Sequence, residues 1–145
     1  LQGQRQVWDH TPSVRPVQFS SITSHYGRRT DPFTGQLAQH RGLDFAARPG
    51  TPIRATAGGT VTDCSRAGGY GLMVEIDHGY GLVTRYGHCS AITVRPGDKV
   101  RRGDMIGRVG TSGRATGSHV HYEVLKNGLH MDPANFVLPT DVVVD

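Results

Sequence analysis

The stretch that decides the fold class reads Leu72-Met73-Val74-Glu75-Ile76, then Asp77-His78-Gly79, then Leu82-Val83-Thr84-Arg85-Tyr86. The two outer runs are rich in β-branched and apolar residues. The Asp-His-Gly triplet between them is typical of a turn, so the stretch predicts a β-hairpin. Residues 59–62 precede it across the breaker Gly68-Gly69 and predict a third strand. Together the three strands indicate an antiparallel meander.

Shorter strands and turns are expected on both sides of this meander. Residues 43–47, 104–109 and 119–124 read as strands. Arg95-Pro96-Gly97-Asp98 predicts a type II turn, because Pro and Gly occupy its two central positions. Asp132-Pro133 starts at most one helical turn, and the 20 glycines and 8 prolines are spread along the chain. We therefore expect an all-β fold.

The length of 145 residues fits one compact domain. Residues 1–18 contain Pro12 and Pro16 without a sustained period, so we expect an N-terminal arm or linker there. This arm is expected to lie over the domain rather than to form a core element. We expect the domain itself at residues 19–138 and a C-terminal tail at residues 139–145.

The net charge of +4 and the pI near 9.4 suit contact with an anionic polymer, but charge alone does not say which. The few aromatic residues are scattered, which argues against a stacking platform, so we expect no nucleic-acid partner. No run of about 18 apolar residues occurs, and we expect no membrane span in this sequence. The start Leu1-Gln2-Gly3-Gln4 does not resemble a signal peptide; for an exported protein, we expect a targeting segment and regulatory domains upstream.

Cys64 and Cys89 are compatible with one disulfide, but their separation matches no zinc-knuckle or redox spacing. Both also suit buried positions for small apolar side chains, and the choice stays open. Alternation along the strand turns Cys89 away from whatever His88 faces, so we do not expect it to bind a metal.

Four of the 8 histidines are expected outside a metal site. His10 lies in the expected arm, His78 in the hairpin turn and His130 after the turn Asn127-Gly128. We therefore expect these three to be solvated loop residues. His25 is expected to border a groove.

The remaining histidines stand in a pattern typical of a metal site: His40 four residues before Asp44, His88 at a strand end, and His119 and His121 around Val120. His119, His121 and Glu123 share one face of their strand, so two imidazoles project into the same cleft. Catalytic zinc commonly takes three His, Asp or Glu ligands and leaves one position for water. The candidates exceed three, so this pattern alone does not choose the ligands.

Longer motifs occur in a fixed order along the chain: His40-Arg41-Gly42-Leu43-Asp44-Phe45-Ala46-Ala47, Gly50-Thr51-Pro52-Ile53, Ala57-Gly58-Gly59-Thr60-Val61, Gly69-Tyr70-Gly71, Tyr86-Gly87-His88, Gly103-Asp104-Met105-Ile106-Gly107, Gly110-Thr111-Ser112-Gly113 and Thr116-Gly117-Ser118-His119-Val120-His121-Tyr122-Glu123-Val124. From about Phe19 to Val137 the chain closely resembles the M23 peptidases, also called the lysostaphin or LytM family. The resemblance implies a two-layer antiparallel β-sheet fold with an open active-site groove. It also implies one Zn²⁺ per chain, bound by His40, Asp44 and His121, with His88 and His119 assisting catalysis.

The resemblance further implies a zinc-dependent endopeptidase that hydrolyses peptide cross-links of bacterial peptidoglycan by metal-activated water. Residues 31–35 resemble the Gram-negative envelope enzymes, which favours the D-alanine to diaminopimelate cross-link over glycine-rich bridges. Within the cell envelope this favours a periplasmic over an extracellular location. One of His88 and His119 is expected to move the proton and the other to stabilise the oxyanion, a division that the sequence leaves open. Glu123 is expected to form a salt bridge or to orient a ligand histidine.

Three other interpretations fit parts of the pattern. A non-catalytic wall-binding or amidase-activating module has the same fold, but such family members usually lack one or more of the polar side chains that this chain keeps. Two histidines and one carboxylate also form the facial triad of non-haem iron(II) oxygenases, which have no need of two further imidazoles. A biotinyl or lipoyl carrier needs a hairpin lysine beside methionine, and Lys99 lacks that neighbour.

Overall fold

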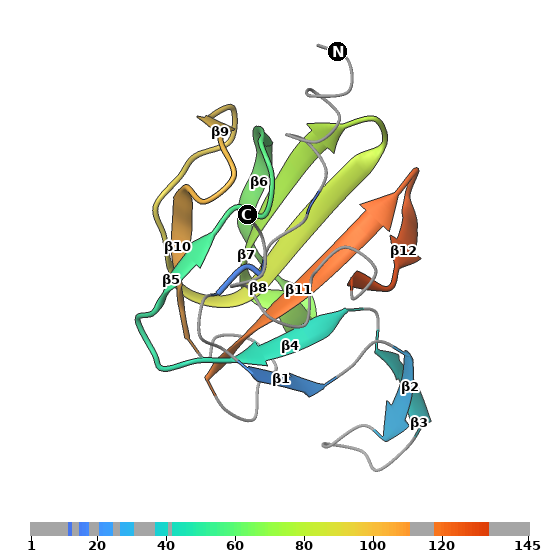
Figure 1. Ribbon diagram of the computed structural model, residues 1–145. Helices are drawn as coiled ribbons and strands as arrows, with labels where there is room; N and C mark the ends of the chain where they lie inside the picture. Colours follow the sequence, from blue (N-terminus) through green and yellow to red (C-terminus); the bar gives the residue numbers. More distant parts are fainter. Residues whose placement is uncertain are drawn as a thin grey trace.

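The computed structural model describes residues 12, 15–17, 21–24, 27–30, 37–40, 42–110 and 118–133, and for residues 21–24, 27–30 and 37–40 it describes the backbone. The elements in these residues are β1 (Ser21–Ser24), β2 (Gly27–Thr30), β3 (Leu37–His40), β4 (Leu43–Ala46), β5 (Pro52–Arg54), β6 (Gly59–Ala67), η1 (Gly68–Tyr70), β7 (Gly71–Gly79), β8 (Leu82–Ile92), β9 (Lys99–Val100), β10 (Met105–Val109), β11 (His119–Lys126) and β12 (Leu129–Met131). Nearly all of this structure is β-strand, so the predicted all-β fold is confirmed (Figure 1). The described part of the chain has no helix with the length and apolar character needed to span a bilayer.

Ten of the described strands form one antiparallel sheet, and β2 pairs with β3 in a separate hairpin. The order along the large sheet is β1-β4-β11-β8-β7-β6-β9, with β12 beside β11. β10 pairs with the last residues of β8 and with β5. Ile106 of β10 and Ile53 of β5 pack with Phe45 of β4 and Tyr122 of β11 in one fully buried core. The β5–β10 pair thus supplies a second layer over that core.

The meander of β6, β7 and β8 forms as predicted, but its hairpin turn lies further along the chain. Asp77 and His78 belong to β7, where Asp77 pairs with Val83. The turn is made by Tyr80 and Gly81, whose φ angles of 55° and 77° are both positive. A two-residue hairpin turn of this kind needs positive φ at both central residues, because only then does it match the twist of the strands. The assignment of Asp77-His78-Gly79 to the turn was therefore wrong.

The expected solvent exposure of His78 was wrong for the same reason. Its side chain is 1% exposed and lies on the core face of β7. His78 Nδ1 lies 2.8 Å from the carbonyl oxygen of Gly58, and Nε2 lies 2.7 Å from Thr84 Oγ1. Since a carbonyl oxygen only accepts, Nδ1 carries a proton and donates it.

A chain of hydroxyl groups in hydrogen-bond contact leads from His78 through the core. Thr84 Oγ1 lies 2.8 Å from the Tyr86 hydroxyl, which lies 3.0 Å from Thr56 Oγ1. Thr56 Oγ1 in turn lies 2.8 Å from the Tyr122 hydroxyl. We call His78, Thr84, Tyr86, Thr56 and Tyr122 the buried hydroxyl cluster. Its members satisfy one another, so these polar groups are buried without an orphaned hydroxyl.

Other turn and strand predictions are confirmed. The amide of Asp98 donates to the carbonyl oxygen of Arg95 at 3.0 Å, and Gly97 has a φ of 97°, as a type II turn requires. Residues 43–47, 104–109 and 119–124 correspond to β4, β10 and β11, and every end agrees within two residues. Residues 134–138 lie outside the described part, so the helical turn expected after Asp132 is not described.

The segment expected to be an arm contributes to the core at its C-terminal end. Val17 is fully buried among the core residues. The carbonyl oxygen of Pro16 accepts a hydrogen bond of 2.8 Å from the amide of Arg54 in β5. Residues 16–17 therefore pack as part of the domain, which corrects the expectation of an arm wholly outside the core.

Cys64 and Cys89 are thiols in this structure and form no disulfide. Cys89 is fully buried in the core, and burial is the main reason that its pKa is raised to about 12. Cys64 is half-buried, and burial followed by the charges of Asp63 and Asp98 raises the pKa of its thiol. These positions match the interpretation of both as small, partly or fully buried side chains.

Candidate metal centre and active site

Asp44 and His121 face each other from neighbouring strands. β4 and β11 pair antiparallel in a register that sets Asp44 directly opposite His121. His121 Nδ1 lies 2.8 Å from Asp44 Oδ1, and both side chains are largely buried. The strand register therefore brings together two residues separated by 77 positions in the sequence.

The two expected catalytic histidines lie beside this pair. His119 projects from the same face of β11, with Nε2 3.9 Å from Asp44 Oδ1. The His88 ring stands edge-on to the other imidazoles, with centroid distances of 4.7 Å to His119 and 6.2 Å to His121. Four of the five predicted site residues thus converge on the face of the sheet opposite the core.

A bulge in β8 turns His88 toward this face. His88 has a φ of 64°, a conformation that a residue with a side chain adopts only at some cost in energy. Tyr86 pairs with Val74, whereas Cys89 pairs with Leu72, so β8 has one residue more than β7 between these pairs. Strict alternation from Tyr86 would send His88 into the core. The extra residue reverses this, so that His88 meets His119 while Cys89 enters the core.

Glu123 holds the opposite side of the His121 ring. His121 Nε2 lies 2.9 Å from Glu123 Oε2, so the imidazole is placed between two carboxylates. Burial alone would lower the pKa of His121, but the hydrogen bonds and charges of Asp44 and Glu123 raise it to about 9. Burial alone would raise the pKa of Glu123, whereas the hydrogen bond and charge of His121, with Tyr70 and His130, lower it. The ring environment is thus one that favours a positive charge.

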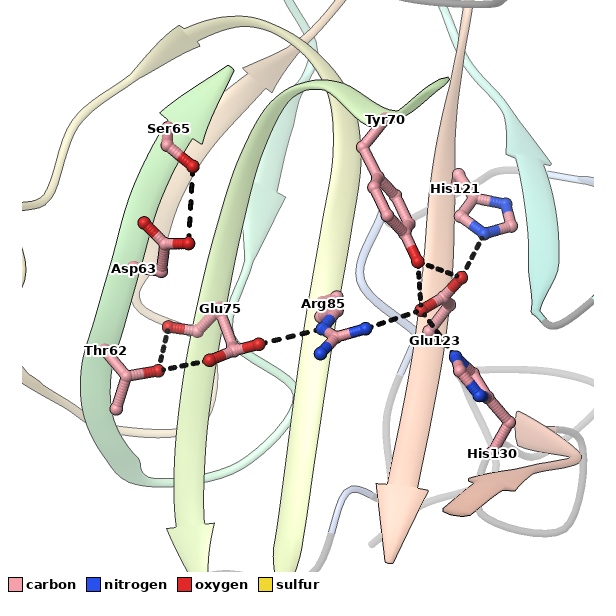
Figure 2. Close-up of polar contacts among 9 residues, drawn as sticks. All are labelled: Thr62, Asp63, Ser65, Tyr70, Glu75, Arg85, His121, Glu123 and His130. Carbon is pink, nitrogen blue, oxygen red and sulfur yellow. Dashed lines mark hydrogen bonds and ion pairs between the residues drawn. The ribbon is translucent and has the colours of Figure 1, made fainter. Parts of the chain in front are cut away.

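Three further residues surround Glu123, and one of them corrects an expectation (Figure 2). The Tyr70 hydroxyl lies 2.9 Å from each carboxylate oxygen, and Arg85 Nη1 lies 3.6 Å from Oε1. His130 Nε2 lies 3.1 Å from Oε1, with its side chain 19% exposed. His130 is therefore not a solvated loop residue, because β12 folds it back against β11.

His40 is the last residue of β3, three positions before β4 begins. Its side chain lies outside the described part, as do His10 and His25. Among the side chains that are described, no group of three His, Cys, Asp or Glu residues is arranged to bind a metal ion. The full ligand set of His40, Asp44 and His121 stays a prediction.

The described pair nevertheless fits a zinc ion in donor type and nearly in spacing. A carboxylate oxygen and an imidazole nitrogen are usual zinc ligands. Zinc bonds of about 2.0–2.1 Å at a tetrahedral angle place two ligand atoms roughly 3.3 Å apart. The 2.8 Å between Asp44 Oδ1 and His121 Nδ1 is a hydrogen-bond distance, which a small opening converts to that spacing.

The sequence pattern of Peptidase family M23 matches residues 38–133, which include all five predicted site residues. This chain belongs to peptidase family M23. The DD-carboxypeptidase/endopeptidase Mpg of Neisseria meningitidis serogroup B is 43% identical over 128 residues, covering 88% of this chain and 30% of the relative. The peptidoglycan DD-endopeptidase ShyC of Vibrio cholerae serotype O1 is 41% identical over 125 residues, covering 86% and 29%.

A solved structure agrees with the M23 assignment. A zinc-containing peptidase from Vibrio cholerae has a TM-score of 0.74 and 34% identity, covering 86% of this chain and 38% of that one. The M23 chain described here spans about a third of the length of the curated relatives it matches.

Sequence reasoning missed Arg85 and His130 as neighbours of this M23 site and gave Tyr70 no role. Tyr70 had a signal, because it stands in the Gly69-Tyr70-Gly71 motif. Arg85 had none: its role follows from its register opposite Glu123 and Glu75 on the two adjacent strands. His130 depends on the β11–β12 hairpin, whose short second strand carries little sequence pattern.

Proposed function

We propose that this domain is a zinc-dependent endopeptidase that hydrolyses peptide cross-links of bacterial peptidoglycan. The observation that carries the proposal is the facing pair of Asp44 and His121, 2.8 Å apart, with two further imidazoles beside it. Metal-assisted amide hydrolysis needs oxygen and nitrogen ligands together with groups that exchange protons near neutral pH. The non-catalytic alternative gives no reason for this second pair of imidazoles.

Three side chains are proposed to bind one Zn²⁺ per chain: His40, Asp44 and His121. His40 ends β3 and Asp44 lies in β4 next along the chain, so a short connection separates the two. When bound, zinc supplies Lewis-acid polarisation and lowers the pKa of water. Asp44 and His121 contribute by holding their ligand atoms on strands rather than on loops.

His88 and His119 are proposed as the catalytic residues. One accepts a proton from the attacking water and returns one to the leaving amine, and the other donates a hydrogen bond to the oxyanion that forms on the scissile carbonyl. Their rings are 4.7 Å apart, which suits two groups that act on one tetrahedral centre. The bulge at His88 supports this assignment, since strained backbone at a polar side chain is characteristic of functional sites.

The proposed substrate is the D-alanine to diaminopimelate cross-link, acted on in the cell envelope and specifically in the periplasm. The name DD-endopeptidase carried by the Vibrio cholerae relative supports this choice of bond. The net charge of +4 favours contact with an anionic wall. Because the relatives are about three times longer, we propose that regulatory domains precede this one in the whole protein.

Purified cross-linked peptidoglycan tests the proposal. The protein is incubated with it in the presence of zinc, with a chelator, and with the chelator followed by added zinc, and the released fragments are identified by mass. We expect new D-alanine carboxyl and diaminopimelate amine ends, lost with chelator and restored by zinc. Glycine-bridged peptidoglycan serves as the substrate control. A zinc-loaded protein that binds the wall and creates no new ends contradicts the proposal and leaves a wall-binding module.

A further inference from the structure

Glu123 is a buried carboxylate that the proposed reaction does not use. Its side chain is 3% exposed, yet four groups contact it (Figure 2). His121 Nε2 lies 2.9 Å from the carboxylate, and the Tyr70 hydroxyl lies 2.9 Å from each of its oxygens. His130 Nε2 lies at 3.1 Å and Arg85 Nη1 at 3.6 Å. These groups come from β11, η1, β12 and β8. A buried charge with so many donors is held in one position, because each donor fixes a different side of it.

This arrangement determines which nitrogen of His121 is left for a metal. The carboxylate of Glu123 only accepts hydrogen bonds, so the Nε2 atom that contacts it carries a proton. The other ring nitrogen, Nδ1, is directed at Asp44 Oδ1, which also only accepts, so without a metal the ring carries a proton on both nitrogens. Nδ1 is nevertheless the nitrogen that faces another proposed ligand, so it is the one placed to exchange its proton for a metal that Asp44 also binds. A neutral imidazole with its proton on Nε2 presents its lone pair at Nδ1.

We propose that Glu123 is a positioning residue that holds the His121 ring so that Nδ1 is the metal-binding nitrogen. The proposal deepens the proposed function and rests on its zinc site. Carboxylates that accept the second N–H of a ligand histidine fix the ring orientation and strengthen metal binding. Glu123 accepts the Nε2 proton of His121 in this way, and we propose that it affects the metal only through its hold on that ring.

The sheet gives Glu123 a rigid support. Glu75, Arg85 and Glu123 lie directly opposite one another on β7, β8 and β11. Arg85 Nε donates to Glu75 Oε2 at 2.8 Å while its Nη1 reaches Glu123. Figure 2 follows this row onward to Thr62 of β6, whose hydroxyl lies 2.9 Å from Glu75 Oε1. The position of the carboxylate is thus set by strand register.

Gly42 closes the site over Glu123 from the connection before β4. A Cβ atom at this position would clash with the carbonyl oxygen of Tyr122 and would lie 3.0 Å from Glu123 Cγ. The glycine therefore allows the backbone at position 42 to lie close against β11. Gly42, two positions before the proposed ligand Asp44, thus packs on the residue that orients His121.

A purely structural role for Glu123 is the rival explanation, and Glu75 provides a matched control. Both glutamates pair with Arg85 on the same face of the sheet, but only Glu123 contacts His121. Zinc affinity is measured by competition with a chromogenic chelator for the wild type, Glu123→Gln and Glu75→Gln. Thermal melts of the metal-free proteins show whether each variant is folded.

We expect Glu123→Gln to weaken zinc binding by about 10- to 100-fold, the usual effect of altering such a partner. We expect Glu75→Gln to weaken it much less, because Glu123 keeps its contacts with His121, Tyr70 and His130. Equal losses in the two variants, or no loss in Glu123→Gln, overturn the proposal. If Glu123→Gln does not fold, the ring nitrogens of His121 in the wild-type protein still test the proposal. In ¹⁵N spectra of the zinc-loaded histidine-labelled protein we expect His121 to bind through Nδ1 and to keep its proton on Nε2. Binding through Nε2 overturns the proposal.

These readouts separate this proposal from the proposed function. Zinc bound through Nδ1 and weakened in Glu123→Gln, with no fragments released from peptidoglycan, supports the positioning role and contradicts the peptidase activity. Released fragments with zinc bound through Nε2 support the peptidase activity and contradict the positioning role. A wild-type chain that binds no zinc contradicts both.

Discussion

His78 and His121 are two buried histidines of the same sheet with opposite surroundings. His78 lies on the core face, where it contacts the carbonyl oxygen of Gly58 and the hydroxyl of Thr84. His121 lies on the other face, between the carboxylates of Asp44 and Glu123. β7, β8 and β11 thus carry the buried hydroxyl cluster on one side and a charged cluster on the other.

The difference indicates which cluster serves folding and which serves chemistry. The buried hydroxyl cluster contains no carboxylate and its groups contact one another, so loss of a member exposes unsatisfied polar atoms. Around His121 two negative charges converge on one imidazole, a place where a cation is favoured. Changes on the charged face are therefore expected to alter metal binding and activity, and changes on the core face to alter stability.

The largest effect is expected from Asp44→Asn. The substitution keeps the size of the side chain and removes the charge that faces His121 Nδ1. We expect the purified variant to retain no zinc and to release no more peptidoglycan fragments than the chelator-treated wild type, because a neutral amide is a poor zinc ligand. Metal content by mass spectrometry and fragment analysis are the measurements.

Asp77→Asn is the control for this change. Asp77 is exposed on β7 and accepts a hydrogen bond from the amide of Gly79. We expect Asp77→Asn to have the zinc content and the rate of hydrolysis of the wild type. Normal zinc retention in Asp44→Asn would show that the charged face does not bind the metal as we propose.

His88→Asn is expected to lower the rate while the zinc stays bound. Asparagine tolerates the positive φ at this position better than most residues, so the bulge is preserved. Loss of a proton-transferring imidazole is expected to reduce kcat by about 10²- to 10⁴-fold. Rates on a purified cross-linked peptide, with zinc content measured on the same samples, test this. Zinc loss that accompanies the rate loss would instead make His88 a metal ligand.

The two faces differ in how far the sequence predicts them. The face assignment within β11 follows from alternation alone, and Val120, Tyr122 and Val124 are indeed fully buried. The pattern of Asp44 and the histidines indicated a metal site on the charged face, and the resemblance to the M23 peptidases, rather than the spacing, implied which residues bind the metal. The buried hydroxyl cluster gave no comparable pattern, since threonines and tyrosines in strands are common for other reasons.

The features that the sequence did not predict depend on local backbone conformation and on strand pairing. The bulge that turns His88 to the site depends on a single extra residue, which no residue type in Tyr86-Gly87-His88 requires. The turn at Tyr80 and Gly81 competes with an equally suitable Asp-His-Gly triplet, and the difference decided whether His78 was buried. Contacts of Glu123 with Arg85 and His130 depend on strand partners, which are set by tertiary pairing rather than by local sequence.

On the core face, Tyr86→Phe is expected to reduce stability without altering catalysis. The Tyr86 hydroxyl contacts Thr84 Oγ1 and both the amide and the hydroxyl of Thr56. Removing it takes the partner of the buried Thr56 amide away, whereas the hydroxyls of Thr56 and Thr84 keep one contact each. We therefore expect the free energy of unfolding to fall by about 1–3 kcal/mol. Urea unfolding of the metal-free protein measures this, with the exposed Tyr80→Phe as control. A change in zinc affinity in Tyr86→Phe would mean that the two faces are not independent.

The smallest effect expected is a difference in reactivity between the two thiols. Cys89 follows the bulge in β8, and its side chain lies on the core face next to His88, which faces the site. Because its pKa is about 12, roughly 10⁻⁴ of the thiol is ionised at pH 8, and the thiolate is the reactive form. We expect iodoacetamide at pH 8 to modify the half-buried Cys64 slowly in the folded protein and to leave Cys89 unmodified until urea unfolds the chain. Peptide mass mapping after timed quenching distinguishes the two. Cys89 labelling as fast as Cys64 would place Cys89 outside the core. The bulge would then not separate it from His88, and the two faces of β8 would have to be assigned again.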